Sequence, residues 1–217
     1  DEEPRTIGYY GYSSSLKANN PDWFPSQTIL DLYDDNDLRK DVYFEKAELV
    51  KIQSFEIKDL YVISKYKGNP AYDENVPRYI IAPKLFRMGE IYMIAAESAY
   101  MLGDAYLSKA DKYLNDFRQS RGLEAAEGVS LLEAIKEERT RELAFEGERF
   151  WDLRRWGDGM NRMSPQISND PISENSTETV DTNYLSNMSP FDLKVDMNSY
   201  RWIWPIPYNE LTTNINI

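Results

Sequence analysis

Residues 137–156 read EERTRELAFEGERFWDLRRW, and this stretch decides the fold. It contains no proline, and its good helix formers are interspersed with apolar residues at every third or fourth position. We therefore predict one continuous helix from Glu137 to Trp156. Because residues three or four positions apart lie on the same side of a helix, the spacing defines one face. Its members are Ile135, Arg139, Glu142, Glu146, Phe150 and Leu153.

This face is apolar at both ends and ionic in the middle. An ordinary surface helix keeps its charges opposite its apolar stripe. An unpaired buried charge costs several kcal/mol, so on a buried face Arg139 must pair with Glu142, with Glu146 or with partners elsewhere. We expect the face to point inward and the aromatic end, which includes Trp156, to pack into a shared core.

Three segments carry a resemblance to a known family. The stretch LLEAIKEERTRELAFEGERFWDLRRWG, residues 131–157, closely resembles the signature of the SusD/RagB family. SQTILDLYDDNDLRKDVYF at Ser26 to Phe44 and YRWIWPIPYNELTTNINI at Tyr200 to Ile217 fit the same family, in the expected order. Members are glycan- and peptide-binding lipoproteins of the outer membrane in Bacteroidetes. The resemblance covers most of the chain and corresponds to the C-terminal half of a family member.

The resemblance implies a mainly α, SusD-like fold with a tetratricopeptide-type helix hairpin, further helices, long loops and a few short strands. Residues 1–217 would then form the C-terminal half of that fold. Its expected parts are a loop-rich region with short strands (1–83), the helix hairpin (84–122), the signature helix (128–157) and loops with an aromatic tail (158–217). The expected structural signature consists of Asp37, Arg39, Arg139, Glu142, Glu146 and Trp156, with Asp37 and Arg39 joined by a turn or a salt bridge.

Local patterns predict the elements around the signature helix. Ser26 is a candidate N-cap of a short helix, and Ser130 with Glu133 forms a candidate capping box. Gly103 and Gly122 are expected to end two helices. The predicted helices are Ser26–Leu32, Lys84–Leu102 and Ala105–Ser120, the last capped by Asp104, and the predicted strands are Val42–Phe44, Phe55–Ile57 and Tyr61–Lys67.

Two apolar faces are expected in the helix hairpin. The first helix would bury Phe86, Ile91, Tyr92, Ile94, Ala95 and Ala99, and the second would bury Leu107, Ala110, Leu114 and Phe117. A solenoid needs about three such hairpins to cover its faces, and the sequence contains one. By the resemblance the remaining repeats lie in the other half, so one apolar flank would be open here.

Composition excludes several kinds of function. The formal net charge of −12 argues against nucleic acid as a partner. The absence of Cys and His removes thiol nucleophiles, imidazole chemistry and the usual zinc sites. The acidic run at Asp34–Asp41 lacks the Gly and terminal Glu of a calcium loop, so we expect neither a metal nor a cofactor.

Membrane attachment is expected from the resemblance and not from these residues. No apolar run approaches the ~20 residues that span a bilayer, and the chain opens DEEPRT without a signal peptide. In the family a lipoprotein signal and an acylated Cys would lie far upstream, which suggests that this chain is a fragment.

An aromatic, loop-rich segment at Asp1–Pro25 is the candidate ligand surface. Aromatic rings can stack on sugars, and neighbouring amide or acid groups can fix hydroxyls. The candidate contacts are Tyr12, Asn20, Asp22, Trp23 and Phe24. No family motif assigns them this role, and the alternative is that the rings seal the loop onto the body.

The preferred hypothesis is a non-catalytic module at the cell surface that captures oligosaccharide or peptide and passes it to a SusC-type TonB-dependent transporter. A helical-repeat interaction scaffold is one alternative. A glycoside hydrolase is another, since such enzymes need two carboxylates about 5–9.5 Å apart and Glu142 and Glu146 lie one turn apart. Both glutamates share a face with Arg139, so pairing within the core explains them better.

Overall fold

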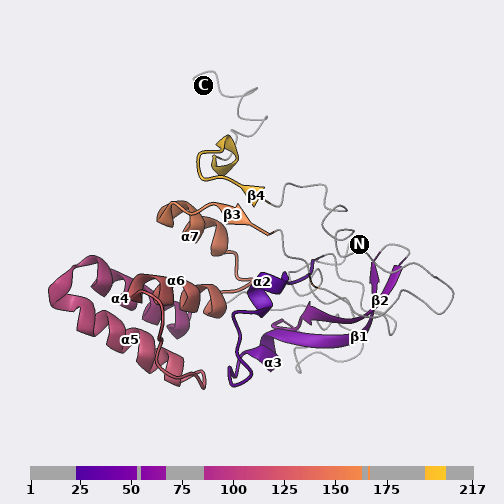
Figure 1. Cartoon of the computed structure of the whole chain (residues 1–217), viewed down its shortest axis with the longest axis horizontal. Coiled ribbons are helices and arrows are strands. Elements are labelled where there is room, and N and C mark those ends of the chain that lie inside the picture. The colour runs from indigo at the N-terminus through magenta and orange to yellow at the C-terminus, as the bar shows by residue number, and fades with distance from the viewer. Residues whose placement is uncertain (1–22, 53–54, 67–85, 163–165, 167–193, 204–217) are drawn as a thin grey trace.

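The computed structural model describes residues 23–52, 55–66, 86–162, 166 and 194–203 (Figure 1). This part of the chain is mainly α-helical, as predicted, with two small antiparallel sheets. Its helices are α2 (Gln27–Leu30), α3 (Lys40–Tyr43), α4 (Met88–Met101), α5 (Leu107–Gln119), α6 (Leu131–Glu142) and α7 (Arg149–Trp156), with 3-10 turns η1 (Asp104–Tyr106) and η2 (Tyr200–Trp202). Its strands are β1 (Phe44–Ile52), β2 (Phe55–Ile63), β3 (Met160–Asn161) and β4 (Lys194–Val195).

Helices α4, α5 and α6 form one packed layer (Figure 1). Small side chains let the helices approach closely, because most of the buried cluster between them is alanine. The cluster consists of Ala96, Ala99, Ala110, Leu114, Ala134 and Ile135. Gly103 and Gly122 end α4 and α5 with positive φ angles of 90° and 82°, as expected of helix-ending glycines.

The predicted inner face of the first hairpin helix is wrong for three of its six residues. Helix α4 begins at Met88, and Phe86, Ile91 and Ile94 are exposed. Of the predicted members, Ala99 is buried and Tyr92 and Ala95 are half-buried. Met93 and Ala96, which were not predicted, are buried, because α5 and α6 contact that side. Along α5 the prediction is better: Ala110, Leu114 and Phe117 are buried and Leu107 is half-buried. Asp104 lies in η1 and does not cap α5.

The predicted continuous helix from Glu137 to Trp156 is also wrong, because residues 143–148 separate α6 from α7. Phe145 and Gly147 in this break have positive φ angles of 65° and 91°. The start of α6 is as expected, since the Ser130 hydroxyl accepts a hydrogen bond from the Glu133 amide at 3.3 Å. Gly157 ends α7 in the left-handed conformation.

Side chains from distant segments bind the carbonyl groups at the end of α6, where a helix leaves its last carbonyls without partners. The Tyr33 hydroxyl donates to the Arg141 carbonyl at 2.6 Å, and the Tyr43 hydroxyl donates to the Glu142 carbonyl at 3.3 Å. Lys65 donates to the carbonyls of Glu142 and Ala144 at 3.0 and 2.8 Å. These tertiary hydrogen bonds replace the helical ones and account for the break.

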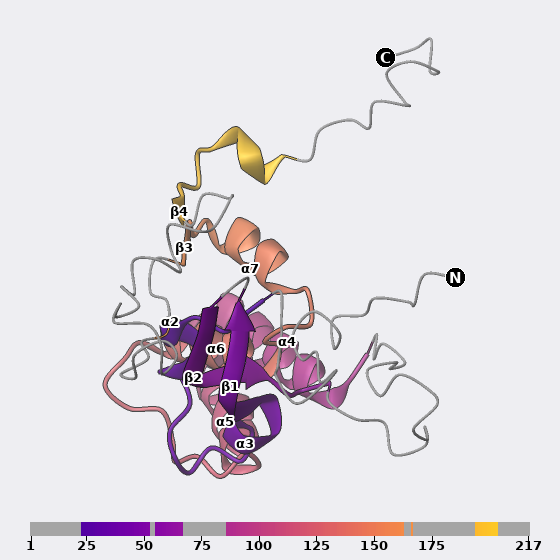
Figure 2. The ribbon, with the colours of Figure 1, turned by 90° about the vertical axis from the view of Figure 1, so that its right-hand side faces the viewer.

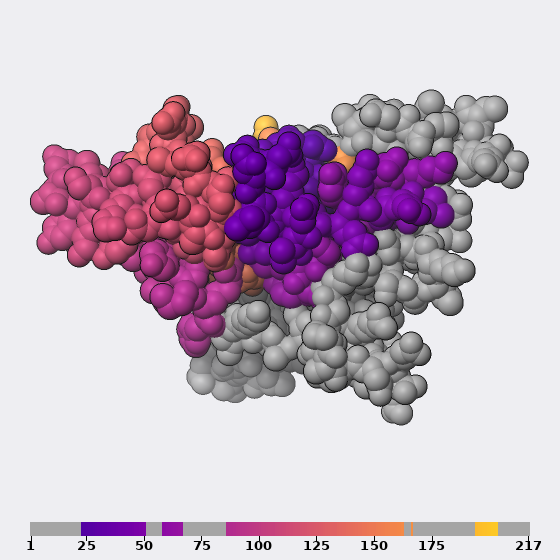
Figure 3. Space-filling view, turned by 90° about the horizontal axis from the view of Figure 1, so that it is seen from below, coloured from indigo at the N-terminus to yellow at the C-terminus, as the bar shows by residue number. Residues whose placement is uncertain are grey.

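Strands β1 and β2 form one antiparallel hairpin in which Phe44 pairs with Ile63 and Val50 with Ile57. The predicted strand at Val42–Phe44 is wrong for its first two residues, which belong to α3. The predicted strand Phe55–Ile57 is part of β2, whereas only the first three residues of Tyr61–Lys67 are, since β2 ends at Ile63. The short helix α2 is capped by Ser26, as predicted. In Figure 2 the hairpin stands in front of α5 and α6, and in Figure 3 residues 23–66 meet the helical layer along one boundary.

The C-terminal segment contacts α7 through one aromatic pair. Trp202 is buried, and its ring centroid lies 5.4 Å from that of Phe150. The packing expected of this tail is therefore confirmed for Trp202, whereas Tyr200 and Ile203 are exposed and residues 204–217 lie outside the described residues. Within the described ranges, none of the helices has the length and apolar character needed to cross a bilayer.

Candidate functional site

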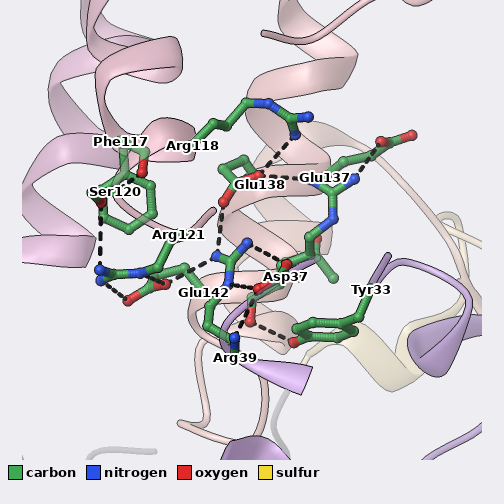
Figure 4. Close-up of polar contacts among 12 residues, drawn as sticks. Tyr33, Asp37, Arg39, Phe117, Arg118, Ser120, Arg121, Glu137, Glu138 and Glu142 are labelled. Carbon is green, nitrogen blue, oxygen red and sulfur yellow. Dashed lines mark hydrogen bonds and ion pairs between the residues drawn. The ribbon is translucent and has the colours of Figure 1, made fainter. Parts of the chain in front are cut away.

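The largest concentration of polar contacts in the described residues surrounds two carboxylates of α6, Glu138 and Glu142 (Figure 4). Glu142 is 1% exposed and is bound by arginines from three segments. Arg39 and Arg121 donate to it at 3.0 Å, Arg121 through a second nitrogen at 3.1 Å, and Arg87 contacts it as well. Glu142 therefore ties the loop before α3 and the ends of α4 and α5 to α6.

Glu138 binds a second set of cations one turn earlier. Arg118 and Arg141 donate to its Oε2 at 3.1 and 2.7 Å. Its Oε1 lies 2.7 Å from Nη1 of Arg39 as an ion pair, without hydrogen-bond alignment. Arg39 is thus shared between both glutamates, and one guanidinium offsets charge from two turns of α6.

Asp37 fixes the orientation of Arg39. It accepts hydrogen bonds from Nε and Nη2 of Arg39 at 2.9 and 2.8 Å, and a third from the Arg39 backbone amide at 2.9 Å. Two parallel bonds to one carboxylate hold a guanidinium in a defined plane. The salt bridge expected from the DLR sequence is confirmed, since Asp37 binds Arg39. In the same acidic run Asp35 binds Lys40.

Arg139 pairs with acidic residues that follow α6 in the chain. It is buried, as predicted, but its Nε binds both oxygens of Asp152 at 2.8 and 2.9 Å, and its Nη2 lies 3.8 Å from Glu148. Of the alternatives left open by the sequence, the structure therefore shows partners elsewhere, whereas Glu142 and Glu146 bind other cations.

Glu146 and Trp156 complete the signature residues. Glu146 binds Arg87 at 2.6 and 2.7 Å and Lys65 at 2.5 Å. Trp156 is half-buried, donates to Glu97 at 2.9 Å and lies under the Arg155 guanidinium, 4.6 Å from its ring centroid. The expectation of an aromatic end inside a shared core holds only in part, since Trp151 is exposed.

The electrostatics of the cluster favour a structural role. Burial opposes ionisation of Glu142, but the hydrogen bonds and charges of Arg121 and Arg87 outweigh it and lower the pKa of Glu142 to about 2. A glycosidase general acid needs a raised pKa. Glu142 instead holds a fixed negative charge between arginines, and its predicted partner Glu146 is bound by Arg87 and Lys65. This arrangement does not support the hydrolase alternative.

The candidate ligand contacts are described only in part. Tyr12, Asn20 and Asp22 lie outside the described residues. Trp23 is 50% exposed and Phe24 is half-buried. The structure therefore places one large aromatic side chain of the predicted set at the surface, and the grouping of all five stays a prediction.

Gln166 anchors the backbone next to Trp23 and Phe24. Its buried amide donates to the Pro25 carbonyl and to the Tyr61 carbonyl, each at 2.9 Å, and accepts from the Tyr61 amide at 2.8 Å. The segment that carries the two rings is thus fixed to β2. Sequence reasoning missed Gln166, as well as Arg87 and Arg121, because no local pattern distinguishes them from surface residues.

Comparisons with known proteins agree with this architecture. The sequence matches the model of the SusD family over residues 5–217, nearly the whole chain. The chain belongs to the SusD family. Curated proteins provide no match to it.

Solved structures of SusD superfamily proteins share the fold. One from Bacteroides thetaiotaomicron is 25% identical, with a TM-score of 0.63 over 88% of this chain and 39% of its own. One from Bacteroides vulgatus is 22% identical, with a TM-score of 0.59 over 94% of this chain and 40% of its own. A further B. vulgatus structure, described as a SusD-like carbohydrate binding protein, is 22% identical with a TM-score of 0.58, over 88% of this chain and 40% of its own. The chain thus spans about 40% of the length of these SusD-family structures.

We predict that Glu142→Ala lowers the free energy of unfolding by about 3–5 kcal/mol, because it leaves buried arginine charge without its partner. Urea denaturation followed by circular dichroism measures this loss. The matched control is Glu137→Ala on the same helix: its partner Arg141 is buried, but the Glu137 side chain is 41% exposed. That change should cost at most about 1 kcal/mol. Equal effects of both variants would contradict a buried ionic centre.

The stability contributed by Glu142 should depend on pH. Its pKa is about 2 when folded and 4.5 ordinarily, so the unfolded chain binds the extra proton between these values. The contribution is therefore complete above pH ~4.5 and is lost as the pH falls toward ~2. The difference in unfolding free energy between the natural protein and Glu142→Gln should shrink over this window. A constant difference from pH 6 to pH 2 would refute the assignment.

Gly89→Ala should destabilise the protein, although alanine normally stabilises a helix by about 1 kcal/mol relative to glycine. A Cβ at position 89 would collide with the Glu142 carboxylate and would lie 2.5 Å from Nη1 of Arg87. Thermal unfolding should show a lower Tm for Gly89→Ala and for Gly89→Ala with Glu142→Gln. A raised Tm in the single variant would show that the ion pair tolerates the methyl group.

Proposed function

We propose that this protein is a non-catalytic binding protein that captures oligosaccharide, or alternatively peptide, nutrients at the cell surface. The observation that carries the proposal is the match to the SusD family over residues 5–217. The site chemistry supports it, since the buried carboxylates of α6 are held by arginines and the predicted ligand segment presents an aromatic ring.

Trp23 is the proposed ligand platform. An exposed indole offers a flat apolar face, which suits the face of a sugar ring. A rigid backbone reduces the entropy lost on binding, and the amide of Gln166 supplies that rigidity two residues away at Pro25. Tyr12, Asn20, Asp22 and Phe24 are proposed to extend the same surface.

The proposed partner is a SusC-type TonB-dependent transporter, and the proposed location is the outer surface of the outer membrane, with a lipid anchor elsewhere in the full gene product. This part of the proposal follows from family membership. Affinity purification of the tagged protein from detergent-solubilised outer membranes tests it. Recovery of a TonB-dependent transporter at a stoichiometric level is expected, and its absence would reject the partner.

We predict that Trp23→Ala weakens oligosaccharide binding by about tenfold or more, which corresponds to ~1.4 kcal/mol. A glycan array run on the full gene product selects the oligosaccharide, and isothermal titration calorimetry measures the affinity. Trp151→Ala is the matched control, because Trp151 is 48% exposed and Trp23 is 50% exposed. The control should leave the affinity unchanged.

Three outcomes would each change a different part of this proposal. Unchanged affinity in Trp23→Ala would remove Trp23 from the site. Release of shorter sugars when the purified protein is incubated with the selected oligosaccharide would show hydrolysis and reject the non-catalytic function. Binding of peptides but no glycan on matched arrays would assign the peptide alternative.

A further inference from the structure

Arg149, the first residue of α7, has a fixed orientation but no opposite charge in direct contact. Its Nη1 donates a hydrogen bond to the Thr140 hydroxyl oxygen at 2.9 Å, and that hydroxyl itself donates to the Lys136 carbonyl at 2.7 Å. The guanidinium carbon lies 5.9 Å from the ring centroid of Trp156. Both partners of the guanidinium are neutral, and within the described residues Arg149 forms no ion pair. The side chain is therefore held in place while its charge has no direct counter-charge.

The carboxylates around this guanidinium bind other cations. Asp152 is buried and accepts hydrogen bonds from Arg139 at 2.8 and 2.9 Å and from Arg155 at 2.9 Å. Asp158 accepts a hydrogen bond from Lys136 at 3.1 Å. Each carboxylate already has a cationic partner of its own, so neither supplies the contact that the guanidinium lacks.

Arg162, directly after β3, adds a second positive charge to this site. It is exposed and likewise forms no ion pair in the part of the chain that the structure describes. Partial burial of the guanidinium lowers the pKa of Arg149, and the charge of Arg162 lowers it further, against the opposing charges of Asp152 and Asp158. The surroundings thus stabilise the positive charge less well than water does, and an incoming anion would supply the missing stabilisation.

The geometry of the guanidinium indicates which anion fits. Its N–H donors form a planar fork that matches the two oxygens of a carboxylate. We propose that Arg149 and Arg162 bind the carboxylate of a uronic acid in an oligosaccharide ligand. This inference rests on the proposed binding function and narrows its ligand to an acidic glycan. Because the chain has a formal net charge of −12, such a ligand requires a local cationic site. The two arginines lie on elements other than the segment that carries Trp23.

Calorimetry with paired oligosaccharides tests this site. A glycan array that carries uronic-acid oligosaccharides beside the same compounds after carboxyl reduction selects the pair, and isothermal titration calorimetry on the purified protein measures both affinities. The acidic form should bind about tenfold or more tightly than the reduced form, because hydrogen bonds between charged groups are stronger than neutral ones. Equal affinities would overturn this inference and leave the proposed function standing. Binding of no glycan at all would overturn both.

Substitutions then locate the carboxylate. Arg149→Gln and Arg162→Gln should each reduce the preference for the acidic form by about threefold or more, with the affinity for the reduced form unchanged. Arg162 lies outside the helices, so its variant decides the question even if Arg149→Gln does not fold.

Arg154→Gln is the matched control. Arg154 is exposed, belongs to the same helix and forms no ion pair among the described residues, but its position five residues after Arg149 places it on another side of α7. This variant should retain the full preference for the acidic form. A preference that Arg162→Gln leaves intact, or that Arg154→Gln reduces equally, would overturn the proposal. Tighter binding of acidic peptides than of any acidic oligosaccharide would also overturn it.

Discussion

The rest of the structure depends on one physical constraint, which is that the buried carboxylate of Glu142 must be neutralised. Moving a charge from water into a protein interior costs several kcal/mol unless opposite charge surrounds it. Arg39, Arg87 and Arg121 come from three separate segments and meet at this carboxylate. Loss of any of these contacts would leave buried charge on Glu142 less well compensated. The ion cluster therefore joins the helical layer to the residues before β1.

The end of α6 has a second set of partners that reinforces this junction. Carbonyl groups that a helix leaves free must find donors when they are buried. Tyr33, Tyr43 and Lys65 supply donors from the other side of the junction, and Tyr66 donates to the Phe145 carbonyl at 3.1 Å. The side chain of Glu142, through Arg39, and the backbone at the end of α6 therefore both bind the segments around β1 and β2. The main polar cluster thus acts as a rigid connection between two parts of the fold.

The residues that hold the scaffold differ from those proposed to bind the ligand, which is consistent with the proposed binding function. The ionic residues hold the scaffold, and their charges are already matched by neighbouring cations, so they have no free carboxylate to offer a substrate. The proposed ligand platform, Trp23, lies on a segment that the amide of Gln166 fixes to β2. A third kind of surface is the row of exposed apolar side chains on α4, which includes Ile91, Ile94 and Met101.

In the sequence by itself, the resemblance of three segments determined the family, and it implied the mainly α architecture and the Asp37–Arg39 salt bridge. Local spacing and single residues determined the helix ends at Gly103 and Gly122 and the burial of Glu142. Only the tertiary structure decided the break after α6, the buried side of α4 and the true partners of the signature charges. The physical reason is distance along the chain. Tyr33 binds the carbonyl of a residue 108 positions away, and the hydrogen bond from Arg39 to Glu142 spans 103 positions. Periodicity identifies the residues that must be buried, whereas the contacts that bury them depend on how the whole chain folds.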